Sequence, residues 1–149
     1  MDPNPLDLRI EFDSVASDAA RALVINNVDN HNLAATGVSA YYPINLMLRS
    51  GQGETLGGLL GYVWGGWLQI QYLWVAEPVR HAGHATRLMD AAEAYAISRG
   101  AGNATVETHS FQARPFYEKR GYTVFGTLDF YPAGHAKYFL RKPLVATAG

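Results

Sequence analysis

The chain has 149 residues, of which 48% are hydrophobic and 17% are charged, with a formal net charge of -1. A chain of this length and composition can bury a core without disulfides or a structural metal, so we expect one globular domain over residues 1–149. The sequence contains no cysteine, which excludes a disulfide framework, a cysteine nucleophile and thiolate metal sites. The first residues lack the basic and apolar regions of a secretory signal, which predicts a cytoplasmic protein.

Charge is distributed unevenly along the chain. Residues 1–76 contain three basic and seven acidic residues, whereas residues 77–149 contain nine basic and six acidic ones. A nucleic-acid-binding domain normally carries a basic stripe over its whole surface, so we expect no nucleic-acid partner. A moderately basic second half suits a small polyanionic ligand.

An uncharged segment covers residues 55–76 and is long enough in principle to cross a bilayer. It contains five glycines, and its second half alternates apolar and polar residues from Leu68 to Tyr72. Alternation of this kind is typical of strands and not of a lipid-facing helix. The segment therefore predicts two buried strands, and we expect no membrane partner.

The first half of the chain predicts a strand, a helix and three further strands. We expect a strand at residues 8–12, then a helix from Ala19 through Val28 that ends in the asparagine-rich segment 26–32. Three antiparallel strands are predicted next, at residues 44–49, 56–64 and 67–76. Gly65 and Gly66 are typical of a two-residue hairpin turn between the last two.

The second half predicts helices alternating with strands. Apolar residues recur at helical spacing over residues 83–99, and Gly100 is expected to end this helix. A strand at 104–108, a short helix at 113–120 and strands at 122–128 and 138–141 follow. The order predicts an α+β domain with a mixed sheet.

The junction between the strand at 67–76 and the following helix is a candidate anion site. Gly83 allows the backbone to approach a ligand closely, and the free N–H groups at a helix start favour phosphate. Arg80 adds a fixed positive charge. The alternative is that Arg80 and Gly83 belong to an ordinary turn, because the pattern R-x-x-G-x-A occurs often by chance.

Two sequence patterns follow one another along the chain. Leu73, Val75, Arg80, Gly83 and Ala85 fit the pattern [QR]-x-x-G-x-[GA] after a strand reading L-x-V. Ala113, Phe116, Tyr117, Gly121 and Tyr122 fit the later pattern A-x-x-F-Y-x-x-x-G-[FY]. In this order and spacing the two patterns resemble the nucleotide-binding signature and the later block of the GNAT superfamily of acyl-CoA-dependent N-acetyltransferases, in particular its small single-domain bacterial members.

The resemblance implies both a fold and an activity. The implied fold is α+β, with a mixed, mostly antiparallel central sheet, helices on both faces and strands that splay at the CoA site. The implied activity is direct transfer of an acetyl group from acetyl-CoA to a primary amine of a small molecule, without a covalent enzyme intermediate. A homodimer is one expected form of the protein. Two alternatives are a protein or peptide N-acetyltransferase and a non-catalytic acyl-CoA-binding module.

The resemblance also implies roles for residues on the cofactor side. The backbone of Leu73 and Val75 is expected to bind the pantetheine arm, with the Leu73 amide as oxyanion donor. Tyr117 matches the family's usual general acid. The alternative is that Tyr117 has only a structural role and packs in the core. Ser110 stands where the family often has asparagine and is a further expected cofactor contact. The residues expected at the diphosphate are Arg80, His81, Ala82, Gly83, His84 and Ala85.

The sequence determines the general base and the residues of the acceptor site less closely than the cofactor contacts. Glu107, His109 and Glu77 are candidates for the base; we take Glu107 as the catalytic residue, and it shares a strand face with His109. His81 and His84 lie three apart, but no third ligand follows, so we expect no metal. The residues expected to bind the acceptor are Tyr41, Asp129, Tyr131 and His135. Their aromatic rings would form the walls of the site, and the one carboxylate would bind the ammonium group of the acceptor. The alternative is that residues 129–137 form only a turn.

Overall fold

The computed structural model describes residues 7–15 and 17–145. The chain divides into two compact units, and the boundary falls between Ser39 and Ala40. The first six residues, on which the expectation of no secretory signal rests, lie outside the described part. Within the described ranges, no helix combines the length and the apolar character that a bilayer crossing requires.

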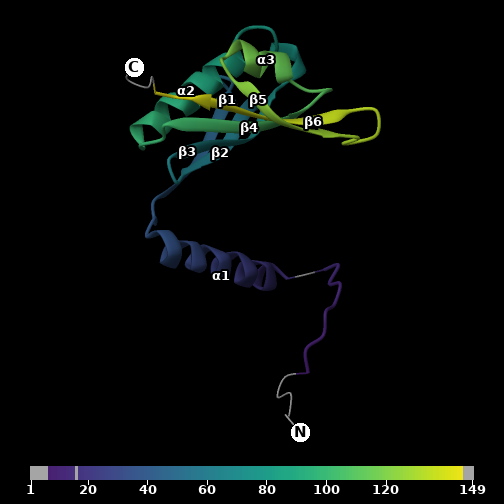
Figure 1. Ribbon diagram of the computed structural model, residues 1–149. Coiled ribbons are helices and arrows are strands. Elements are labelled where there is room, and N and C mark those ends of the chain that lie inside the picture. The colour runs from purple at the N-terminus through teal and green to yellow at the C-terminus, as the bar shows by residue number, and fades with distance from the viewer. Residues whose placement is uncertain (1–6, 16, 146–149) are drawn as a thin grey trace. The chain divides into compact units, whose positions relative to one another are not determined.

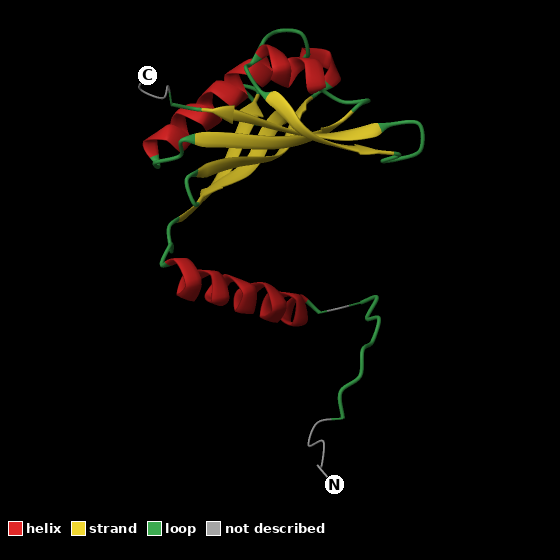
Figure 2. Cartoon of the chain, viewed as in Figure 1, coloured by secondary structure: helices red, strands yellow, loops and turns green. Residues whose placement is uncertain are grey.

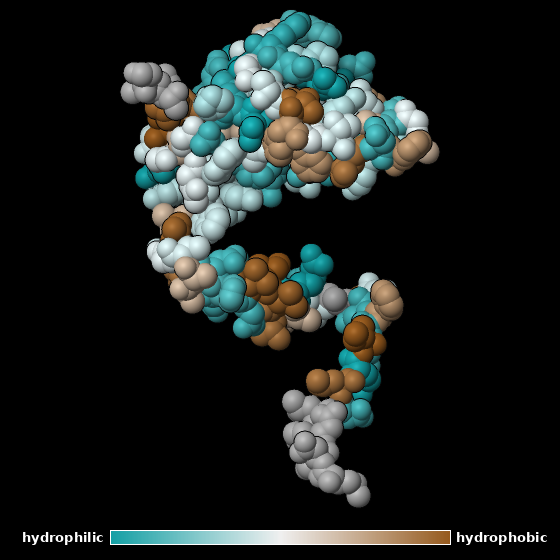
Figure 3. Space-filling model, in the orientation of Figure 1, coloured by the Kyte–Doolittle hydropathy of each residue, from teal (hydrophilic) through white to brown (hydrophobic). Residues whose placement is uncertain are grey.

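The first unit contains one long helix, α1 (Asp18–Thr36) (Figure 1). Ser17 caps its start by accepting a hydrogen bond from the Ala20 amide at 3.1 Å. The prediction that the helix ends in the asparagine-rich segment was wrong, because Asn27 bonds within the helix to the Leu23 carbonyl and the good helix formers Leu33, Ala34 and Ala35 come after that segment. Gly37, with a left-handed φ of 70°, ends it instead. Apolar side chains gather midway along α1 (Figure 3).

The predicted strand at residues 8–12 is absent from the described structure, where these residues form no regular element. In a strand, alternation would place Leu8, Ile10 and Phe12 on one side, but all three side chains are exposed. A strand is stabilised by hydrogen bonds to a neighbouring strand, and the described part of this unit contains none. The periodicity was therefore not sufficient to predict the element.

The second unit is built on a six-stranded sheet in the order β1-β2-β3-β4-β6-β5 (Figure 2). All neighbouring strands are antiparallel except β3 and β4, which are parallel. The predicted α+β class and the mixed, mostly antiparallel sheet are confirmed. The strands are β1 (Tyr41–Arg49), β2 (Thr55–Trp64), β3 (Trp67–Val75), β4 (Asn103–His109), β5 (Thr123–Asp129) and β6 (Ala136–Pro143).

Two helices of this unit, α2 (His84–Ser98) and α3 (Arg114–Lys119), lie on the same face of the sheet (Figures 1 and 2). Ala92 and Ala96 are fully buried, and their small side chains let α2 approach the strands closely. The uncharged segment 55–76 forms β2 and β3, as predicted. Gly65 and Gly66 both have positive φ, which is the conformation of a type I′ hairpin turn.

A bulge bends β3 at the point where it leaves β4. The β2–β3 register passes from Gly61 opposite Ile70 to Leu60 opposite Tyr72, so Gln71 has no opposite residue. Glycine is required at position 61, because a Cβ there would lie 2.3 Å from the Gln69 carbonyl oxygen. Pairing of β3 with β4 ends at Ile70, although both strands continue. The two strands diverge beyond this point, as the family fold implies.

Candidate functional site

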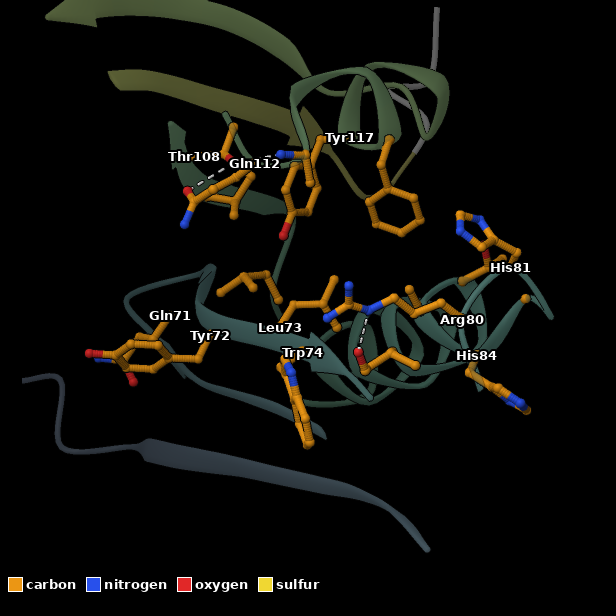
Figure 4. A pocket seen from close by; sticks show the side chains of 18 of the residues that line it. Gln71, Tyr72, Leu73, Trp74, Arg80, His81, His84, Thr108, Gln112 and Tyr117 are labelled. Carbon is orange, nitrogen blue, oxygen red and sulfur yellow. Dashed lines mark hydrogen bonds between the residues drawn. The ribbon is translucent and has the colours of Figure 1, made fainter. Parts of the chain in front are cut away.

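A cavity of about 880 Å³ opens where β3 and β4 diverge (Figure 4). Residues 70–75 of β3 line one side, and residues 106–108 of β4 together with α3 line the other. Because β4 has turned away, the backbone groups of β3 that face the opening have no strand partner in the described second unit. An extended ligand carrying amide groups can bind to such an edge as an added strand. Leu73 and Val75 line this edge, where the sequence predicted the pantetheine arm.

The start of α2 forms one end of the same cavity. Gly83 is the N-cap residue, with a φ of 82°, and no side chain caps the helix. The first N–H groups of a helix have no partner within it, so they are free to bind an anion with the help of the helix dipole. Arg80 lies beside them and donates from Nε to the Val75 carbonyl at 2.7 Å (Figure 4). Of the loop residues predicted at the diphosphate, the cavity is lined by Arg80, His81, Gly83, His84 and Ala85, and not by Ala82.

Tyr117 lies on α3, and its hydroxyl points into the cavity (Figure 4). The side chain is 5% exposed, and the ring packs edge-on against Phe116 and Tyr122. Burial raises the pKa of Tyr117 to about 12. The phenol is therefore protonated at neutral pH and can donate a proton to a group in the cavity.

Gln112 is a cavity residue that the sequence analysis missed. Its Oε1 accepts a hydrogen bond from the His109 amide at 2.8 Å and lies 3.5 Å from the Thr108 hydroxyl. The Ser110 hydroxyl instead accepts from the Ala136 amide at 3.0 Å, and Ser110 does not line this cavity. Gln112 lies two residues after Ser110, just before the second motif, and nothing in its residue type marked it.

A second, polar cavity of about 570 Å³ adjoins the first. The residues that line both are Ile70, Gln71, Tyr72, Glu107 and Gln112. The second cavity is completed by Tyr62, Gln69, His109 and Lys137. The two spaces therefore meet at the bulge in β3 and at the exposed side of β4.

The four predicted acceptor residues line neither cavity. Tyr41 stacks on Tyr62 with ring centroids 5.2 Å apart. Asp129 is exposed at the end of β5, and Tyr131 and His135 belong to the turn between β5 and β6. Glu77, one of the three candidate bases, lies in a short 3-10 helix (Glu77–Val79) and also outside both cavities. Glu107 and His109 are brought to the polar cavity.

Comparison with known proteins gives consistent matches. The model of the acetyltransferase (GNAT) family matches residues 39–122. An acetyltransferase of Agrobacterium fabrum is 33% identical over 128 residues, which cover 86% of this chain and 93% of the relative. The blasticidin-S acetyltransferase of Streptomyces morookaense is 40% identical over 94 residues, which cover 62% and 69% of the two chains. A crystal structure from Agrobacterium tumefaciens, of a protein assigned to the acetyltransferases, has a TM-score of 0.85 at 31% identity and covers 91% of this chain and 99% of that one.

Proposed function

The chain belongs to the GNAT family of acetyltransferases, and we propose that it transfers the acetyl group of acetyl-CoA to a primary amine of a small molecule by direct attack. The resemblance seen in the sequence and the implied α+β fold with a mixed, mostly antiparallel sheet are confirmed by these matches. One observation supports the proposal most strongly. A single cavity contains an unpaired strand edge, an uncapped helix start and a buried tyrosine hydroxyl.

These three features correspond to three parts of acetyl-CoA. The pantetheine arm would pair with the free edge of β3, and the diphosphate would bind at the start of α2, where Arg80 adds positive charge. The Leu73 amide would donate a hydrogen bond to the thioester oxygen as negative charge develops there. Tyr117 would protonate the sulfur as it leaves, because its hydroxyl points into the same space.

The acceptor would enter from the polar cavity, which meets the first at Gln71 and Glu107. Its volume of about 570 Å³ fits a small molecule. The relative named for blasticidin S supports a small-molecule acceptor.

A thiol-release assay with acetyl-CoA and a panel of small amines and peptides tests the proposal. We expect release of CoA with a small amine. Replacement Tyr117→Phe should lower kcat by about 10²–10⁴-fold with unchanged acetyl-CoA affinity, because only the transition state uses the proton. Tyr122→Phe is the matched control, since it removes a second buried hydroxyl that points to Glu93 instead. Turnover with peptides alone would assign the enzyme to protein substrates, and no turnover with any amine would reject the proposal.

A further inference from the structure

The polar cavity is lined by three ionisable side chains, those of Glu107, His109 and Lys137. Glu107 and Lys137 form an ion pair at 2.8 Å. The hydrogen bond to Glu107 raises the pKa of Lys137. The Lys137 ammonium also lies 5.0 Å from the centre of the Tyr131 ring. Glu107 therefore serves as the counter-ion of a lysine that is otherwise held against an aromatic ring.

His109 is held differently. Its Nδ1 lies 2.9 Å from the backbone carbonyl oxygen of Tyr131. A carbonyl oxygen can only accept, so Nδ1 must carry the proton and the neutral ring has its lone pair on Nε2. Nε2 has no hydrogen-bond partner among the side chains and backbone groups of the described residues. The tautomer fixed by this contact is the one that leaves Nε2 free to take a proton.

Aromatic packing fixes the plane of the same ring. Phe111 and Tyr131 both stack with His109, at centroid distances of 5.1 and 5.3 Å and interplanar angles of 18° and 28°. His135 packs edge-on against Phe111 from the β5–β6 turn. A catalytic base needs an orientation fixed by its surroundings, and here a hydrogen bond and two rings supply it.

We propose that His109 is the general base of the transfer reaction, acting through Nε2 on an amine bound in the polar cavity. This inference rests on the proposed function. The amine nitrogen forms a bond to the thioester carbon, and His109 Nε2 takes one of its protons. The carbon–sulfur bond breaks, and the sulfur takes the phenolic proton of Tyr117. His109 then gives its proton to water and the Tyr117 phenolate takes one, so amine and thioester become amide and thiol.

Several ionisable groups face His109 and enter any pH dependence. Lys137 is its register partner on β6, and Glu107 lies two residues away on the same face of β4. Tyr131 and His135 approach from the turn between β5 and β6. The contributions of these groups to the pH dependence of activity are separated by comparing the whole pH profile of each variant described below with that of the parent enzyme.

The test uses the full chain with an amine that the parent enzyme acetylates. His109→Gln should lower kcat/KM by about 10²–10⁴-fold at pH 7 and abolish the acidic limb of the pH profile, with acetyl-CoA affinity unchanged. His109→Ala should regain activity on addition of imidazole, which a structural role would not produce. His31→Gln, the same change on α1, is the control and should match the parent enzyme.

Two results would overturn the assignment. His109→Gln could keep the parental kcat/KM and pH profile, or Glu107→Gln could remove the acidic limb while His109→Gln does not. Nitrogen NMR of the histidine rings gives a readout that does not need turnover. When the His109 ring is neutral, its single proton should be on Nδ1, and a neutral ring with the proton on Nε2 would refute the geometry. A parent enzyme without turnover would reject the proposed function, and the NMR result would still decide the state of His109.

Discussion

Glu93 is a buried carboxylate that joins three elements of the second unit, and its replacement should destabilise the protein strongly. The residue is 7% exposed. It accepts hydrogen bonds from Arg120 Nη2 and Lys142 Nζ, each at 2.6 Å. Arg120 is the C-cap residue of α3, the helix that carries Tyr117. The ion pairs of Glu93 therefore tie α2 to β6 and to the end of α3.

The size of the destabilisation depends on how well the charges of Arg120 and Lys142 are compensated once Glu93→Gln removes the carboxylate. The side chain of Arg120 is 12% exposed, and its Nε already has no partner in the described structure. Removing one member of a buried ion pair costs about 3–5 kcal/mol, because the remaining charge is left uncompensated. Lys142 is 24% exposed and keeps some contact with water, so we expect the lower end, about 3 kcal/mol. At about 4 °C per kcal/mol, Tm should fall by about 12 °C.

Asp90 provides a matched control on the same helix. It pairs with the same Arg120 nitrogen at 2.9 Å, but its side chain is 64% exposed. Exposed ion pairs contribute about 0–1 kcal/mol, so Asp90→Asn should change the free energy of unfolding little. Urea unfolding followed by tryptophan fluorescence measures both variants. Equal losses for the two variants, or a loss below about 1 kcal/mol for Glu93→Gln, would refute the reasoning from burial.

Two glycines support further predictions. Gly83→Val should abolish acetyl-CoA binding in calorimetry, because a side chain is strained at its φ of 82° and displaces the amides at the start of α2. Gly100→Val is the control: this glycine lies beyond the other end of α2 at a φ of 86°, so the variant should keep the affinity for acetyl-CoA. Gly61→Ala should lower both the free energy of unfolding, by about 1–3 kcal/mol, and kcat, because its Cβ would meet the Gln69 carbonyl and displace β3. Gly51→Ala, with no atom within 4 Å of the new Cβ, is its control. Parental affinity in Gly83→Val, or equal stability of the two alanine variants, would contradict these arguments.

Most residues of β3 and the following turn that line the first cavity could be predicted to lie together, because they are nearly contiguous in the chain. Residues 67–85 form a strand, a turn and a helix start, and each step has a local signal: the alternation from Leu68 to Tyr72, Gly83, and helical spacing after it. Tyr117 could be nominated as a site residue for the same reason, since its motif lies on one short helix that begins after Ala113, and its side chain lines the cavity. Such signals need no knowledge of how distant segments pair.

Two predictions of secondary structure in the first unit were wrong. The alternation over residues 8–12 predicts a strand, but a strand also needs a neighbour that the pattern does not specify. The end of α1 was placed too early because asparagine has a low helix propensity, whereas Asn27 uses its amide to bond within the helix. In both cases an intrinsic preference was used without the contact that decides the outcome.

The polar cavity, by contrast, is assembled from segments that meet only through the register of the sheet. Lys137 lies opposite His109 and forms its ion pair with Glu107 because β6 pairs with β4 in one register, and a shift by one residue would turn these side chains to the other face. The group that holds His109 is a backbone carbonyl, that of Tyr131. Every residue has a backbone carbonyl, so the residue type at position 131 does not predict this hydrogen bond. A sequence can therefore nominate Glu107 and His109 together, but only the fold distinguishes a paired carboxylate from an oriented imidazole.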